Sequence, residues 1–323
     1  MPQQIIVTGG AGFIGSAIVW RLNELGHDDI LVVDRLDETD KWRNLAPLKF
    51  TDYMDADDFL DDLGDFKDAE TIFHMGACSS TTVTDADFML RNNYQYTKDV
   101  AEFAVANDIR FIYASSAATY GDGSAGMNDG TDELNGLRPL NVYGYSKHLF
   151  DQYASRKGMF DKIVGLKYFN VFGPNEDHKG DMRSLINKAF GQIKETGKLK
   201  LFKSAHPDYG DGEFGRDFVY VKDAVEMTLH FMKNKTGGLF NAGSGRMNTW
   251  NALADAIFRA LEMPKNVEFI EMPESLRDRY QYHTQADLTR IRAAGYAAET
   301  TALDEAVADY VRNYLVPRKH LGD

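Results

Sequence analysis

A glycine-rich segment near the N-terminus constrains the fold of this chain more than any other part of the sequence. Thr8–Gly15 (TGGAGFIG) follows a short apolar run, Ile5–Val7, and opens an amphipathic run. That order predicts a strand, a tight turn and a helix. Gly10, Gly12 and Gly15 have the G-x-G-x-x-G spacing, and Gly9, Gly12 and Gly15 have a wider-spaced version of it. Such a turn lets the backbone approach a pyrophosphate, which the N–H groups at the start of the helix attract.

A second strand favours a dinucleotide site over an ordinary glycine turn. Ile30–Val33 is apolar and ends in Asp34, which lies 19 residues beyond Gly15. In dinucleotide-binding folds, an acidic residue about 20 residues after the glycines binds the adenosine ribose. The turn and Asp34 together predict a dinucleotide cofactor.

The charge and the single cysteine limit the partners and the compartment. The 323 residues carry a formal charge of −13, which argues against nucleic acid or an anionic membrane as the main partner. Cys78 is the one cysteine, so no internal disulfide can form. The chain enters its first strand almost at once and has no apolar run of about 20 residues, so we expect a soluble cytoplasmic protein. His74 and His178 belong to no cluster with metal-ligand spacing, and no metal is expected.

Strands and helices alternate through the first half of the chain, which predicts an α/β fold of the Rossmann type, a doubly wound parallel sheet. Residues 1–169 are expected to form the dinucleotide-binding domain, to which segments near 217–245 return. Residues 170–323 are expected to form mainly a smaller α/β substrate-binding domain. We also expect a weak strand near Leu48–Phe50, a helix over about 88–107, and Asp223 as the N-cap of a later helix.

Ligands of such sheets bind beyond the carboxyl ends of the strands. Tyr143 and Lys147, four residues apart at the start of a predicted helix, share one helix face. A nearby ammonium lowers the pKa of a tyrosine, so this pair can act as a general acid and base. Ser116 ends the preceding strand and can bind the reacting oxygen, although Ser115 is a close alternative. Tyr94 with Lys98 and Tyr153 with Lys157 have the same spacing, and we interpret them as solvated helix faces.

Four motifs together resemble the extended short-chain dehydrogenase/reductases that act on nucleotide sugars: Thr8–Gly15, Tyr143–Lys147, Arg216–Val221 and Phe240–Gly245. The dehydratases of that group have Thr-Asp-Glu where this chain has Ser116–Ala118, which favours an epimerase or reductase. Longer blocks resemble the ADP-L-glycero-D-manno-heptose 6-epimerase family, and they are 76–82, 92–96, 113–121, 139–147, 178–180 and 284–288.

The resemblance implies epimerisation at C6 of ADP-D-glycero-D-manno-heptose, in the synthesis of a lipopolysaccharide precursor. A bound nicotinamide takes hydride from C6 and returns it to the opposite face, so no net redox change occurs. The family uses two bases, which match Tyr143 and Lys179. The resemblance also implies a homo-oligomer, with a pentamer as the suggested form. A 4-epimerase of the same group and a non-catalytic dinucleotide sensor are the alternatives.

Further roles follow from the resemblance residue by residue. The residues that match cofactor contacts, besides Lys147 and the glycines, are Phe13, Ile14, Asp34, Arg35, Lys41, Gly76, Ala77, Cys78, Ser79, Asn92 and Val171. Those that match substrate contacts are Ser116, Asn170, Asp181, Lys188, Phe202, Lys203, Ser204, Arg216 and Tyr280.

The chain departs from the family pattern at several of these positions. Asp181 and Lys188 stand where serine and histidine are usual, Ala56 aligns with a lysine, and the loop 204–215 is longer. Arg35 stands where asparagine is frequent. Because Arg35 and Lys41 can bind a 2′-phosphate, we predict NADP rather than NAD, whereas Asp34 alone favours NAD.

Overall fold

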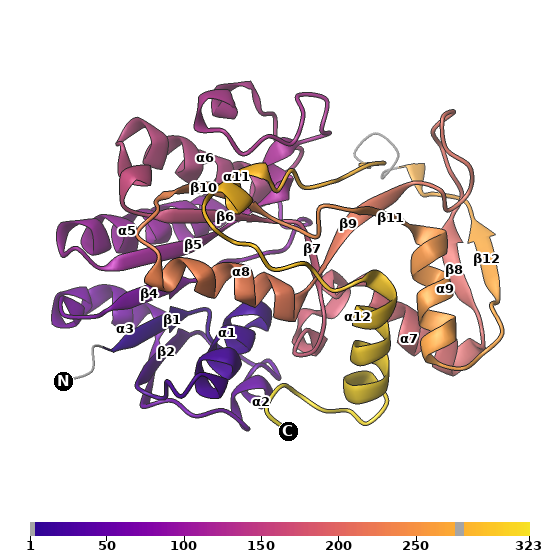
Figure 1. Cartoon of the computed structure of the whole chain (residues 1–323), viewed down its shortest axis with the longest axis horizontal. Helices are drawn as coiled ribbons and strands as arrows, with labels where there is room; N and C mark the ends of the chain where they lie inside the picture. Colours follow the sequence, from indigo (N-terminus) through magenta and orange to yellow (C-terminus); the bar gives the residue numbers. More distant parts are fainter. Residues whose placement is uncertain (1–3, 275–280) are drawn as a thin grey trace.

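A seven-stranded sheet forms the centre of the computed structural model, which describes residues 4–274 and 281–323 (Figure 1). Its strand order is β10-β6-β5-β4-β1-β2-β3, and all neighbours are parallel. The strands are β1 (Ile5–Thr8), β2 (Ile30–Asp34), β3 (Asp52–Asp55), β4 (Thr71–His74), β5 (Arg110–Ser116), β6 (Val164–Tyr168) and β10 (Gly238–Ala242). The predicted Rossmann-type fold is confirmed.

Helices cover both faces of this sheet because successive strand side chains point to opposite sides. Ile5 and Val7 pack with α1 (Phe13–Glu24) and α8 (Val221–Lys233), whereas Ile6 packs on the other face. The helices of that second face are α3 (Ala56–Asp61), α5 (Tyr96–Ala106) and α6 (Val142–Arg156). Short helices α2 (Trp42–Leu45) and α4 (Ala86–Met89) lie in the connections.

The later part of the chain builds a second group of elements at the other end of the molecule (Figure 1). A three-stranded sheet has the order β11-β9-β7, from β11 (Met247–Thr249), β9 (Gly215–Tyr220) and β7 (Asn170–Phe172). β8 (Leu199–Phe202) pairs with β12 (Val267–Ile270). The accompanying helices are α7 (Leu185–Thr196), α9 (Trp250–Ala260) and α12 (Leu303–Asp309), whereas α11 (Thr289–Ala293) lies against β10 of the large sheet.

Two local expectations are wrong. The strand after β2 is Asp52–Asp55 rather than Leu48–Phe50. The helix expected over about 88–107 is confirmed, because α4, the π-helical turn η2 (Leu90–Gln95) and α5 follow one another without a break. Asp223 lies inside the first turn of α8, which Tyr220 precedes as N-cap, and its carboxylate accepts hydrogen bonds from Thr301 instead. Across the described ranges, the helices are too short or too polar to span a bilayer.

Candidate active site

The glycine turn packs directly against the loop that follows β4. Gly9 has a positive φ of 66°, and a Cβ there would lie 2.5 Å from the amide nitrogen of Gly76. A Cβ on Gly15 would lie 2.0 Å from the carbonyl oxygen of Gly9. The fold therefore requires glycine at both positions, and it leaves the start of α1 bare of side chains where a pyrophosphate would bind.

Asp34 braces this turn from the end of β2. One carboxylate oxygen accepts a hydrogen bond from the Ala11 N–H at 2.9 Å, and the other accepts from the Lys41 ammonium at 2.8 Å. Asp34 is buried, so Lys41 compensates a charge that water reaches poorly. Two predicted cofactor residues are thus brought together beside the turn.

Arg35 lies between two partners at the same sheet edge. Its guanidinium donates to the Asn92 side chain at 3.0 Å and forms an ion pair with Asp57. The hydrogen bond from Arg35 lowers the pKa of the Asp57 carboxyl. Asn92 belongs to the π-helical turn η2. Such turns often occur at functional sites. The sequence analysis placed Arg35 and Asn92 at the cofactor but missed Asp57.

Asn93 ties the loop after β4 to helix α6. Its side chain accepts from the Cys78 N–H and donates to the Cys78 carbonyl, both at 2.9 Å. It also donates to the Ser146 hydroxyl at 3.1 Å, and Ser146 donates to the Tyr143 carbonyl at 2.7 Å. Cys78 is half-buried, whereas the Asn93 side chain is fully buried. The Asn93 amide therefore connects the predicted cofactor loop Gly76–Ser79 to the backbone of Tyr143.

The predicted triad converges where β5 ends and α6 begins. Asn141 caps α6 by accepting from the Gly144 N–H at 2.8 Å. The pKa of Tyr143 is raised, rather than lowered as the pairing with Lys147 predicts, because burial outweighs the hydrogen bond with Ser116 that favours the phenolate. Burial lowers the pKa of Lys147 to about 8. Ser115 is excluded from this group because its hydroxyl donates to Asp151 at 2.7 Å.

Lys179 lies beside the start of α1, next to the glycine turn. Its ammonium lies 5.2 Å from the centre of the Phe13 ring, and Phe13 is the first residue of α1. Burial lowers the pKa of Lys179, whereas the nearby Glu176 raises it. Glu176 is itself fully buried and accepts from the Ser184 hydroxyl at 2.6 Å. A lysine in this environment can lose its proton more readily than one in water.

Two further buried residues connect the Lys179 loop to the turn, and the sequence analysis missed both. The Asn44 amide donates to the carbonyls of Ala11 and Asn175, at 3.0 and 3.1 Å. Asn175 has a positive φ of 75° and donates to Ser16 on α1 at 3.0 Å. The C-terminal segment completes this cluster, because the Leu321 N–H donates to Asn175 at 3.0 Å.

The predicted substrate residues are spread over the second group of elements. Asn170 is exposed on β7, and Arg216, on the neighbouring β9, is largely buried and donates to the Gly215 carbonyl. Lys203 pairs with Glu271, and the Lys188 ammonium donates to the Asp181 carbonyl at 3.2 Å. Phe202 lies at the end of β8, and Ser204 lies in the loop that follows it. Val171, which was predicted to contact the cofactor, lies on β7 beside Asn170. Tyr280 lies outside the described residues.

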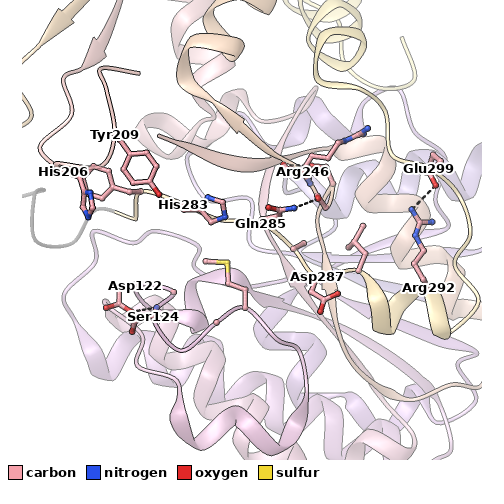
Figure 2. A pocket seen from close by; sticks show the side chains of 18 residues that line it. Asp122, Ser124, His206, Tyr209, Arg246, His283, Gln285, Asp287, Arg292 and Glu299 are labelled. Carbon is pink, nitrogen blue, oxygen red and sulfur yellow. Dashed lines mark hydrogen bonds and ion pairs between the residues drawn. The ribbon is translucent and has the colours of Figure 1, made fainter. Parts of the chain in front are cut away.

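A cavity of about 1100 Å³ is lined by none of the described residues in this set, although its lining residue His206 accepts a hydrogen bond from the Ser204 hydroxyl at 3.0 Å. Asp122 and Ser124 lie on one side of it, with His206 and His283 on the other (Figure 2). The triad, Lys179 and the glycine turn do not line this cavity, so the cavity is separate from the candidate site.

His74 is hydrogen-bonded to Thr8 and Thr97, and burial lowers its pKa to about 3. The described residues contain no group of three side chains arranged for a metal.

Comparison with known proteins agrees with this geometry. Residues 5–243 match the NAD dependent epimerase/dehydratase family. Two similar proteins are named ADP-L-glycero-D-manno-heptose-6-epimerase. The one from Nitratidesulfovibrio vulgaris is 51% identical over 96% of this chain and 97% of its own. The one from Fusobacterium nucleatum is 48% identical over 96% of this chain and 98% of its own.

A solved structure leads to the same group. The ADP-L-glycero-D-manno-heptose-6-epimerase of Helicobacter pylori superposes with a TM-score of 0.83 at 28% identity, covering 96% of each chain. The match over residues 5–243 spans most of the chain. The chain therefore belongs to the NAD dependent epimerase/dehydratase family.

Proposed function

We propose that this protein epimerises ADP-D-glycero-D-manno-heptose at C6, giving ADP-L-glycero-D-manno-heptose. The observation that carries the proposal is the position of Lys179, half-buried and packed against Phe13 of the glycine turn, while Tyr143 stands at the start of α6. Relatives at about half identity bear the name of this activity. The protein would act in lipopolysaccharide precursor synthesis in the cytoplasm, as a homo-oligomer.

A nicotinamide cofactor fits the residues present. A side chain on Gly9 or Gly15 would collide with the backbone of the turn. Because both residues are glycine, the turn stays tight and a pyrophosphate can approach its backbone directly. Gly9, Gly12 and Gly15 would hold the phosphates, Asp34 and Arg35 the adenosine end, and Lys147 the second ribose. When bound, the nicotinamide of the cofactor would accept a hydride from C6 of the sugar and later return it.

Two proton-transfer groups serve the two orientations of the sugar. Tyr143, with Lys147 beside it as a cation, removes the proton from the C6 hydroxyl in one orientation. Ser116 holds the oxygen through its hydroxyl. After the keto sugar turns over, Lys179 supplies the proton to the C6 oxygen from the other side. The lowered pKa of Lys179 suits such a transfer near neutral pH.

We infer that NADP is preferred over NAD. Both oxygens of Asp34 already accept from Ala11 and Lys41, so its charge is offset and does not repel a 2′-phosphate strongly. Arg35 adds a second cation at that edge, although Asp57 shares it. Dissociation constants for the two cofactors on the stripped protein test this preference, and tighter binding of NAD would refute it.

The substrate side is assigned to the second group of elements. Arg216 suits the diphosphate because a guanidinium can bind two phosphate oxygens at once. The remaining proposed contacts are Asn170, Asp181, Lys188, Phe202, Lys203, Ser204 and Tyr280. This assignment corresponds to a substrate-binding domain over most of 170–323, with β10 returning to the large sheet.

The direct test is incubation with ADP-D-glycero-D-manno-heptose, followed by proton NMR of the product without added cofactor. Inversion at C6 is expected, and inversion at C4 of this or another nucleotide sugar would instead support a 4-epimerase. The double variant Tyr143→Phe, Lys179→Met is expected to bind cofactor but lose epimerisation. Tyr145→Phe, Lys194→Met is the matched control, because both of these residues are exposed. Activity retained in the first variant would refute the two-base assignment.

A further inference from the structure

A fully buried ion pair lies beneath the triad and has no part in the reaction described so far. The Lys167 ammonium on β6 lies 2.9 Å from the Asp151 carboxylate on α6, and neither side chain is exposed. Two hydroxyl groups also donate to this carboxylate at 2.7 Å, from Tyr113 and Ser115 on β5. The pair therefore joins two strands of the sheet to the helix that carries Tyr143.

One arm of this cluster reaches Ser116. Lys167 donates to the Thr119 hydroxyl at 2.6 Å, and Thr119 donates to the Ser116 carbonyl at 2.7 Å. Ser116 in turn accepts from the Ala118 N–H at 3.1 Å. The position of the Ser116 hydroxyl depends on this backbone, so the cluster fixes where that hydroxyl stands relative to Tyr143.

The other arm reaches Lys147 through the helix. Asp151 follows Lys147 by four residues on α6, which places the two side chains on one helix face. The other ionisable groups that act on or face Lys147 are Cys78, from the loop after β4, and His74, from β4 itself. His74 stays neutral in the pH range of activity because burial lowers its pKa to about 3. Asp151 is the anion that opposes the effect of burial on Lys147.

We propose that Asp151 and Lys167 form a positioning unit for catalysis, in which Asp151 keeps Lys147 cationic and Lys167 fixes Ser116 through Thr119. The proposal rests on the function proposed above. Stability alone is a weak reason for such a pair, because apolar residues of similar volume often stabilise a protein as well or better. A pair that connects to two members of the triad has a reason to be ionic.

The pH dependence of kcat separates this role from a structural one. The double variant Asp151→Asn, Lys167→Met removes one negative and one positive charge, so the net charge of the buried cluster does not change. Lys147 nevertheless loses the Asp151 carboxylate that favours its charged form, so the pKa of Lys147 falls and the ammonium is lost at a lower pH. The alkaline limb of the profile should move to lower pH, with kcat at pH 8 reduced about tenfold or more. The matched control is Asp129→Asn, Arg290→Met, which removes another buried carboxylate and its cation, 3.2 Å apart. Its limb should stay in place.

A third variant tests the Ser116 arm and leaves both charges in place. Thr119→Val breaks the link to the Ser116 carbonyl, so kcat should fall while KM and the alkaline limb remain unchanged. This variant also keeps the proposal testable if the charge-free double variant does not fold, which its melting temperature reveals. An unmoved limb in the folded double variant, an equal movement in the Asp129 control, or a wild-type kcat in Thr119→Val would overturn the proposal. A wild-type protein without epimerase activity would instead refute the proposed function.

Discussion

Replacing Gly15 by alanine tests whether the glycine turn has the role assigned to it. Gly15 lies inside α1, where alanine is ordinarily about 1 kcal/mol more favourable than glycine. Here the new Cβ would lie 2.0 Å from the Gly9 oxygen, which would have to retreat by about 1.4 Å to reach an ordinary contact of 3.4 Å. That oxygen also accepts from the Gly12 N–H at 3.0 Å, so the whole turn must move.

The expected loss falls on cofactor binding more than on folding. A hydrogen bond to a charged group contributes about 1.5–3 kcal/mol, so misplacing one backbone N–H that binds the pyrophosphate weakens binding by roughly 10- to 100-fold. The measurement is the dissociation constant of NADP by isothermal titration calorimetry on cofactor-free protein.

Gly191→Ala is the matched control for this variant. Gly191 lies within α7, and a Cβ there would meet no atom within 4 Å. It should bind NADP as the wild type does and melt at the same or a higher temperature. Binding by Gly15→Ala within twofold of the wild type would refute the role of the turn.

Two other perturbations give predictions with defined signs. Asp57→Asn releases Arg35 from its ion pair, so the preference for NADP over NAD should rise, by no more than about fivefold because exposed ion pairs are weak. The control Asp58→Asn changes an exposed neighbouring residue and should leave the preference unchanged. An unchanged ratio of the two dissociation constants in Asp57→Asn would contradict the assignment of Arg35 to the 2′-phosphate. His74 has a folded-state pKa of about 3 against an ordinary 6.5, so the unfolded chain takes up its proton first as the pH falls. His74 should therefore contribute a drop in the free energy of unfolding of about 1.4 kcal/mol per pH unit between pH 6.5 and about 3, and His74→Gln should lessen the slope by that amount, whereas the exposed His283→Gln should not.

The parts of the site that the sequence could predict are those built from one continuous segment. The glycine turn and the Tyr143–Lys147 pair are local patterns whose spacing alone reflects backbone geometry. Asp34 is nearly as local, because it ends the strand that pairs with β1. The structure brings these residues to the same ends of the strands, as the parallel sheet requires.

The residues that the sequence analysis missed depend on contacts between distant segments. Asn44 and Asn175 are single polar residues in no motif, and Asn93, although it lies in the block 92–96, has no role assigned by that block; their roles follow only from the partners that folding brings to them. The contact between His320 and Asn44 joins residues 276 positions apart. No local spacing could indicate that the C-terminus lies beside the Lys179 loop.

The misplaced strand has a different cause. Two of the three residues in Leu48–Phe50 are strongly apolar, whereas Asp52–Asp55 has a charged residue at each end; β3 is the edge strand of the sheet, and its side chains are only partly buried or exposed. An edge strand needs less apolar surface and often carries charge. Hydrophobicity therefore pointed to the wrong segment of this connection.

The fate of deuterium at C6 tests the central claim, that hydride is removed from the sugar and returned to it by a cofactor held in the site. ADP-D-glycero-D-manno-heptose deuterated at C6 is incubated with the wild-type protein in ordinary water, and the product is examined by mass spectrometry and NMR. The account predicts an inverted C6 that keeps its deuterium. An inverted C6 that has exchanged its deuterium for solvent hydrogen would contradict it.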